Sequence, residues 1–185
     1  MDTKEINIAF DLEANGLEAT RIHCIVTQDL DTGLVEEYND EKYADDPKVL
    51  PMSASRSIAN GLSNLMCATN VVSHNGIAYD VPQAQKIFPF FRDFKSNHWD
   101  TLILSRFYYP NLLDIDLRRK WAGMPAKLYG SHSLEAYGYR LKCYKGDYGK
   151  TSNWSEWTPD MQEYCKQDVA VLVKLWNHFQ KFLTQ

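Results

Sequence analysis

The order of strand-like and helix-like segments is the feature that most limits the folds open to this chain. Three strand-like runs come first, over residues 5–11, 21–28 and 34–38, and the turn sequence Asp31-Thr32-Gly33 separates the last two. Short turns of this kind join antiparallel neighbours. The chain is therefore expected to begin with a three-stranded antiparallel meander.

Helical and strand-like segments alternate after the meander. Residues 58–66 carry apolar side chains at helical spacing behind Ser53 and Ser55, and residues 71–74 form a short apolar run. A helix over 81–87, a strand near Trp99 and a helix over 101–107 follow. Helices between strands indicate crossovers to parallel neighbours. We expect one α/β domain over residues 1–185, with a mixed five-stranded sheet (three antiparallel strands, then two parallel) flanked by helices.

The pattern weakens after Pro110 and becomes clear again near the C-terminus. Loops are expected beyond Pro110, with a short helix over 133–137. The last helix has Thr158 as its N-cap and Pro159 at its first position, followed by an apolar stripe.

Composition excludes several classes of protein. No run of 18 apolar residues occurs and the N-terminus lacks an export signal, so we expect a cytoplasmic protein that does not enter a membrane. The four cysteines show no Cys-x-x-Cys spacing and are interpreted as reduced core thiols.

Charge is unevenly distributed along the chain. Residues 1–50 hold 13 acids and 4 bases, for a net charge of −9, whereas residues 117–150 hold 8 bases and 2 acids, for a net charge of +6. The overall charge of −4 therefore does not argue against a nucleic-acid partner, because the acidic and basic parts can serve one site.

Three short patterns bring carboxylates to candidate positions. Asp11 and Glu13 end the first strand, and the two-residue period of a strand puts both on one face. Such a pair favours a hard cation, Mg²⁺ or Mn²⁺, although solvated acids at a strand end are the commoner interpretation of this pattern alone. Asp80 follows a strand and the His74-Asn75-Gly76 turn, and an ordinary N-cap explains it about as well.

The third pattern lies on the final helix. Tyr164 and Asp168 are four residues apart and so share a face, although a packed tyrosine beside a surface aspartate is the default interpretation. The three patterns in this order, on these elements, are unlikely to occur together by chance.

With these residues in place, the chain resembles the DnaQ-like 3′→5′ exonucleases of the ribonuclease H-like fold, in the subclass whose four acids are accompanied by a tyrosine. It is most similar to the proofreading domain of the DNA polymerases of short-tailed coliphages. The resemblance rests on residues 11–15, 74–80, 100–106 and 130–141. The sister subclass has histidine five residues before the last aspartate, and here that position is Glu163.

The resemblance implies a role for each site residue. Asp11, Glu13, Asp80 and Asp168 would hold two ions of Mg²⁺ or Mn²⁺, and Tyr164 would place the attacking water. The following assignments are less specific. Leu17 matches a leucine that wedges against the terminal base in the relatives, although a core leucine is nearly as plausible. Asp100 matches an acid of the phage domains, but an aspartate before a helix is equally a helix cap. Asn75 and His132 lie in matched segments and would contact the substrate.

The segment over residues 117–150 mixes basic and aromatic side chains, which are the components of a groove for single-stranded nucleic acid. A solvated cover over the sheet is the alternative. The residues assigned to substrate binding are Arg118, Arg119, Lys120, Trp121, Lys127 and Tyr129.

The sequence thus predicts a proofreading exonuclease that acts on single-stranded DNA 3′ ends and releases 5′-monophosphates. Two alternatives remain open: a 3′→5′ exoribonuclease similar to ribonuclease D, and a non-catalytic subunit that binds DNA ends. The chain ends about where the phage polymerases begin their polymerase portion, so an excised domain or a separately encoded exonuclease that works with a separate DNA polymerase is expected.

Overall fold

The computed structural model describes residues 5–40, 56–143 and 153–183, and its centre is one five-stranded sheet. The strands are β1 (Asn7–Ala14), β2 (Ile22–Asp29), β3 (Val35–Tyr38), β4 (Asn70–Ser73) and β5 (Asn97–Asp100). Their order is β3-β2-β1-β4-β5. The β1–β2 and β2–β3 pairs are antiparallel, and the β1–β4 and β4–β5 pairs are parallel. The predicted mixed sheet is confirmed.

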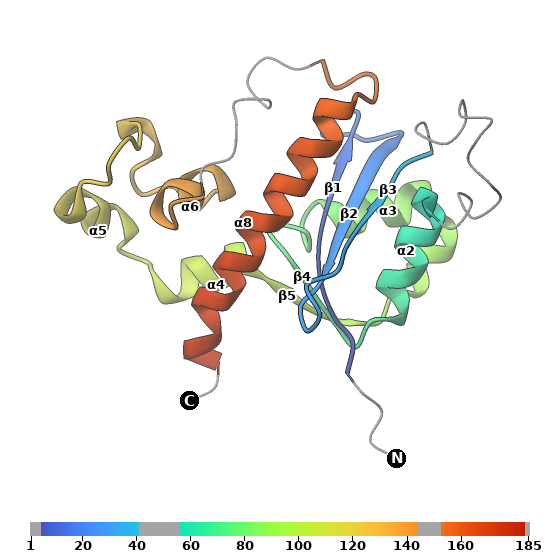
Figure 1. Ribbon diagram of the computed structural model, residues 1–185, viewed down its shortest axis with the longest axis horizontal. Helices are drawn as coiled ribbons and strands as arrows, with labels where there is room; N and C mark the ends of the chain where they lie inside the picture. Colours follow the sequence, from blue (N-terminus) through green and yellow to red (C-terminus); the bar gives the residue numbers. More distant parts are fainter. Residues whose placement is uncertain (1–4, 41–55, 144–152, 184–185) are drawn as a thin grey trace.

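The helices cover both faces of this sheet (Figure 1). They are α2 (Ile58–Cys67), α3 (Asp80–Ile87), α4 (Thr101–Tyr108), α5 (Leu112–Arg119), α6 (Leu134–Arg140) and α8 (Pro159–Leu183), with 3₁₀ turns η2 (Pro89–Asp93) and η3 (Ala126–Leu128). None of the described helices is long and apolar enough to cross a bilayer.

Alternation along β1 sends its side chains into two separate cores. Ile8, Phe10 and Leu12 pack with α2 and with Ala84 of α3, whereas Ala9 packs on the opposite face with Leu172 and other residues of α8. Asp11 and Glu13 continue the Ala9 row. The strand period therefore directs both carboxylates toward the long C-terminal helix.

Local signals explain where several elements begin and end. The Asp29 carboxylate accepts from the backbone N–H of Asp31 (2.9 Å) and of Thr32 (2.7 Å), and Gly33 adopts a φ of 76°, which closes the β2–β3 turn. Thr158 Oγ1 accepts from the Met161 N–H (3.1 Å), as expected of an N-cap. At α2 the cap is Ser57, and Ser53 and Ser55 lie outside the described residues.

The expectation of loops after Pro110 was wrong for one segment, because residues 112–119 form α5. This helix buries only Leu112 and Asp116, while Leu113 and Leu117 are half-exposed. Its buried face is therefore part apolar and part acidic, so the usual apolar stripe of an amphipathic helix is absent. In Figure 1, α5 and α6 form a lobe on the side of α8 away from the sheet.

Candidate active site

The first two carboxylates lie side by side at the end of β1. Asp11 pairs with Val26 of β2, and Glu13 pairs with Cys24, just before a bulge at Glu13/Ala14. Both side chains are half-buried, so the interpretation as fully solvated strand-end acids does not hold. The shared face predicted from the strand period is confirmed.

Asp80 reaches the same place from the β4–α3 connection. It is the first residue of α3, whose N-cap is Tyr79, and it is 4% exposed, so the interpretation of Asp80 as an ordinary N-cap is wrong. Its carboxylate accepts from the backbone N–H of Leu12, which lies between Asp11 and Glu13. This hydrogen bond fixes Asp80 directly against the acidic strand.

The connection before Asp80 is tightly packed. A Cβ on Gly76 would clash with Ser73 Oγ and Cβ and would lie 3.3 Å from the Asp80 carboxylate, so only glycine fits there. The Asp100 carboxylate holds the same loop by accepting from the N–H groups of Asn75 (2.9 Å) and Ile77 (3.2 Å) while capping α4. Asp100 is therefore both a helix cap and a support for the loop that delivers Asp80.

Helix α8 supplies the remaining two predicted residues. Asp168 is only 6% exposed, so the interpretation as a surface aspartate is wrong, and Tyr164 is half-buried with its ring edge-on to Trp154 at 6.1 Å between centroids. Burial raises the pKa of Glu13 well above its usual value, and the charges of Asp11 and Asp168 add to this effect, with smaller contributions from Cys24 and Asp80. The other three predicted carboxylates are therefore all close enough to Glu13 to repel it.

A fifth group, Cys165, was predicted only as a core thiol. It is fully buried and its Sγ lies 3.4 Å from the Asp11 carbonyl oxygen and 3.7 Å from Asp11 Oδ2. Burial and the neighbouring Cys24 raise the pKa of this thiol well above its usual value. The protonated thiol is a donor to Asp11, and its position three residues before Asp168, on the same helical face, is the sequence signal that would have found it.

Not all four cysteines are core thiols. Cys24 and Cys165 are buried, but Cys143 is half-buried and Cys67 is exposed.

The donor set fits hard divalent cations. Among the described residues, ligand atoms of Asp11, Glu13 and Cys165 lie within 4.8 Å of one another. Asp80 and Asp168 lie outside this tight group but near enough to affect Glu13. Carboxylate oxygens are the ligands that Mg²⁺ and Mn²⁺ prefer, and a cation would relieve the repulsion among the acids. The thiol stays protonated and is therefore a poor ligand.

Leu17 lies beside this cluster, and its side chain is exposed. The Tyr79 hydroxyl donates to the Gly16 carbonyl (2.7 Å) and Gln83 Nε2 donates to the Leu17 carbonyl (3.1 Å), which fixes the backbone after β1 to α3. The Leu17 side chain is nevertheless 85% exposed. The alternative of a core leucine is therefore wrong.

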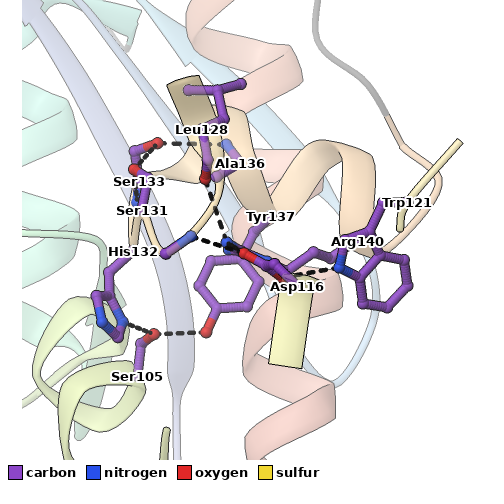
Figure 2. Close-up of polar contacts among 11 residues, drawn as sticks. Ser105, Asp116, Trp121, Leu128, Ser131, His132, Ser133, Ala136, Tyr137 and Arg140 are labelled. Atoms are coloured by element: carbon purple, nitrogen blue, oxygen red, sulfur yellow. Dashed lines mark hydrogen bonds and ion pairs between the residues drawn. The ribbon is translucent and has the colours of Figure 1, made fainter. Parts of the chain in front are cut away.

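Two of the other predicted substrate residues lie on the loops before α3 and α6. Asn75 is exposed in the loop before Asp80 and adopts a left-handed φ of 68°, which asparagine tolerates. His132 lies just before α6, and its Nδ1 is 2.6 Å from Ser105 Oγ (Figure 2). Burial lowers the pKa of His132, and the Arg140 and Arg106 charges lower it further.

The remaining predicted substrate residues lie on the α5–α6 lobe. Arg118, Arg119 and Lys120 are exposed at the end of α5, and Lys127 is exposed on η3. Trp121 and Tyr129 are half-buried and pack on a small core with Met124, Leu128 and Ala136. Residues 144–150 of the basic segment lie outside the described residues.

Arg140, one of the bases of this segment, is buried and paired with an acid of α5. Its guanidinium donates to Asp116 from Nε (3.0 Å) and from Nη2 (2.7 Å), as Figure 2 shows.

Comparison with known proteins finds relatives among phage DNA polymerases. The chain is 34% identical to the DNA-directed DNA polymerase of Escherichia phage T7 over 187 aligned positions, 89% of this chain and 25% of the polymerase. Identity is also 34% with the corresponding polymerase of Enterobacteria phage T3, over 87% of this chain and 25% of that polymerase. The chain is thus similar to one part of two phage DNA polymerases.

A solved structure shares the fold of this chain. The EXO domain of Aedes aegypti Nibbler superposes with a TM-score of 0.60 at 16% identity, covering 98% of this chain and 80% of that domain. This likeness supports the ribonuclease H-like arrangement of the sheet. No family model matches the sequence. The chain spans about a quarter of the length of the phage polymerases that it matches.

Proposed function

We propose that this chain is a metal-dependent 3′→5′ exonuclease that hydrolyses the terminal phosphodiester of single-stranded DNA and releases 5′-monophosphates. The observation that carries the proposal is the convergence of Asp11, Asp80 and Asp168 on Glu13, three carboxylates that each raise its pKa. Like charges gathered at the end of a strand oppose folding. Their presence therefore indicates a function that needs them. Divalent-metal hydrolysis of a phosphodiester is such a function.

The four acids would hold two ions of Mg²⁺ or Mn²⁺ against the terminal phosphate. Such ions stabilise both the attacking and the leaving oxygen of an in-line displacement at phosphorus. Asp11 and Glu13 hold fixed positions because they belong to a paired strand, and Asp80 is held by the Leu12 N–H. Tyr164, one helical turn before Asp168, is proposed to orient the attacking water through its hydroxyl.

The protein surface around the acids supports a single-stranded substrate. Leu17 presents an exposed apolar side chain on a fixed backbone, which suits packing against a terminal base. Asn75 and His132 are proposed to contact the sugar-phosphate near the cleaved bond. Buried Asp80 and Asp168 require that the last nucleotide leave its stack before it is cleaved.

The cellular role belongs to the same proposal. Similarity to phage polymerases supports proofreading in the cytoplasm of a phage-infected cell, by residues 1–185 as one exonuclease domain working with a polymerase on a separate chain. Mixing the two proteins on a mismatched primer tests this partnership. Removal of the mismatch no faster than the sum of the separate activities would contradict it.

The reaction is tested with linear single-stranded DNA labelled at either end, a circular single strand, and RNA of the same sequence, each with Mg²⁺, Mn²⁺ or chelator. The proposal expects stepwise shortening of the 5′-labelled strand, immediate release of labelled mononucleotide from the 3′ end, an intact circle, and no reaction with chelator. Faster hydrolysis of RNA would favour an exoribonuclease instead.

A matched pair of variants separates the site from general charge effects. Asp168→Asn should lower turnover by at least roughly a hundredfold because it removes a charge that faces the metals. Asp31→Asn removes one acid from the exposed β2–β3 turn and should leave turnover unchanged. Activity that survives in a folded Asp168→Asn protein would overturn the assignment.

A further inference from the structure

A cavity separate from the carboxylates lies between the α5–α6 lobe and the end of α8. Its volume is about 630 Å³, within the range of small-ligand sites, and its walls include Tyr109, Leu112, Arg118, Tyr137 and Lys181. Asp168 and Lys181 both lie on α8, and at 1.5 Å per residue they are separated by about 20 Å along its axis.

The cavity wall is cationic. Arg118, Arg119 and Lys181 line it, and all three are exposed. No carboxylate lines the cavity in the part of the chain that the structure describes. His178 adds little charge at neutral pH, because burial and the Lys181 charge lower its pKa.

Arg140 is a buried cation in the same wall. The residue is 9% exposed, and Asp116 binds its Nε and Nη2. Its Nη1 is also buried and has no hydrogen-bond partner among the described residues. An unpaired guanidinium N–H is costly, and an anionic oxygen is the acceptor that it favours.

Aromatic side chains complete the wall. The Tyr137 ring lies 4.8 Å from the Arg140 guanidinium, and Trp121 lies 5.3 Å from that of Arg119. The Tyr109 hydroxyl is 2.7 Å from His178 Nε2, which fixes another ring at the edge. Cations interleaved with aromatic faces suit a ligand that carries both a phosphate and a flat ring.

We propose that this cavity is a second binding site, distinct from the metal-binding carboxylates, for the phosphate and base of a nucleotide. Two sources supply that chemistry: a nucleotide of a DNA strand whose 3′ end lies at the carboxylates, and a free nucleotide. At the 3.4 Å spacing of stacked bases, about 20 Å corresponds to roughly six nucleotides from the cleaved end. Only the first source rests on the proposed function.

The test measures binding of each probe to the full chain in the presence of chelator, where no hydrolysis occurs. Its result therefore does not depend on whether the protein is an exonuclease. The probes are deoxythymidine monophosphate, a trinucleotide and a dodecanucleotide, all of thymidine. Arg118→Gln combined with Lys181→Gln should weaken binding of a probe that occupies the cavity roughly tenfold. The slope of log affinity against log salt concentration should fall by the equivalent of about two phosphate contacts. Both substitutions are on exposed side chains, so folding should be preserved.

The matched control is Arg92→Gln combined with Lys95→Gln. These two exposed bases flank Asp93 on the opposite side of the molecule, near the core of Phe91, and their loss changes the net charge equally. A loss confined to the dodecanucleotide supports a strand site, and a loss for the monophosphate supports a free-nucleotide site. Wild-type affinity for all three probes, or a loss equal to that of the control, overturns the proposal.

Discussion

At the scale of single residues, Asp80 shows that the site makes the charged form of a carboxylate unfavourable. Burial raises its pKa to about 7 and Asp100 adds to the rise, although backbone N–H groups oppose it. The folded protein therefore binds a proton at Asp80 more tightly than the unfolded chain does. Between about pH 4 and 7, the contribution of Asp80 to the stability of the metal-free protein should therefore fall as pH rises.

Replacing Asp80 with asparagine tests this directly. The amide keeps the acceptor for the Leu12 N–H and removes the titration, so the variant should be more stable than the wild type at pH 8 and equal to it near pH 4. The difference at pH 8 should be on the order of 2–4 kcal/mol. Denaturant unfolding of both metal-free proteins at several pH values measures it, and a constant difference across that range would contradict the expectation.

Tyr164 allows a prediction that separates orientation from metal binding. Tyr164→Phe keeps the ring against Trp154 and removes only the hydroxyl. Turnover should fall roughly tenfold to a hundredfold, whereas the Mn²⁺ concentration that gives half-maximal activity should not change. Asp168→Asn should shift that Mn²⁺ concentration. A Tyr164→Phe enzyme with a weakened metal response would show that the hydroxyl does more than orient water.

The sequence was informative about these residues to different degrees. The strand period put Asp11 and Glu13 on one face and helical spacing did the same for Tyr164 and Asp168, but neither pattern alone indicated a metal site. The pattern around Asp80 left an ordinary N-cap equally open, because no local pattern encodes its hydrogen bond to β1. The roles of these residues came from the resemblance. The neighbours that constrain the site, including the Cys165 thiol against Asp11, arise from packing between elements far apart in the chain.

At the scale of elements, the α5–α6 lobe depends on one buried ion pair. Asp116 is fully buried and accepts from Arg140 (2.7 Å) and from the Trp121 indole (2.7 Å), as Figure 2 shows. It also accepts from the Gly130 N–H (2.8 Å). A single carboxylate thus connects α5, the following turn and α6. This connection is also why α5 escaped sequence prediction: the key residue on its buried face is an acid, and its partner lies 24 positions away.

Asp116→Asn should therefore destabilise the protein by about 3–5 kcal/mol, because it leaves the Arg140 charge buried without its counterion. Asp114→Asn, on the exposed face of the same helix, should change stability by less than about 0.5 kcal/mol. The free energies of unfolding in denaturant compare the two. Adding Arg140→Met to Asp116→Asn should recover part of the loss, and a mild effect of Asp116→Asn alone would show that the pair is dispensable.

At the scale of the whole molecule, the mixture of antiparallel and parallel strands was predictable and the use of the basic segment was not. Alternation of period-two and helical patterns determined that antiparallel strands would precede parallel ones. Net charge along residues 117–150 indicated an anionic ligand but did not distinguish exposed Arg118 from Arg140, which is committed to Asp116. Which side a charged residue faces depends on how α5 and α6 pack against each other, as the Arg140–Asp116 pair shows, and that is not a local property.

The arrangement of the whole site predicts a preference for unpaired ends. Two of its carboxylates are nearly inaccessible, so a terminal nucleotide must leave the duplex to reach them, at a cost of a few kcal/mol. Single-turnover hydrolysis should therefore be roughly 10 to 100 times slower at a fully paired 3′ end than on a single strand, with a 3′-mismatched end between the two. Equal rates on paired and mismatched ends would contradict this.

Leu17 supplies the variant that links this preference to structure. If its exposed side chain packs against the terminal base, Leu17→Ala should slow hydrolysis of paired ends more than that of single strands, because help with separating the last pair is lost. Ile103→Ala, which shortens another exposed apolar side chain on α4, is the matched control and should slow neither substrate. An equal loss on both substrates for Leu17→Ala would mean that the leucine contributes general binding and that duplex opening is left to thermal fraying.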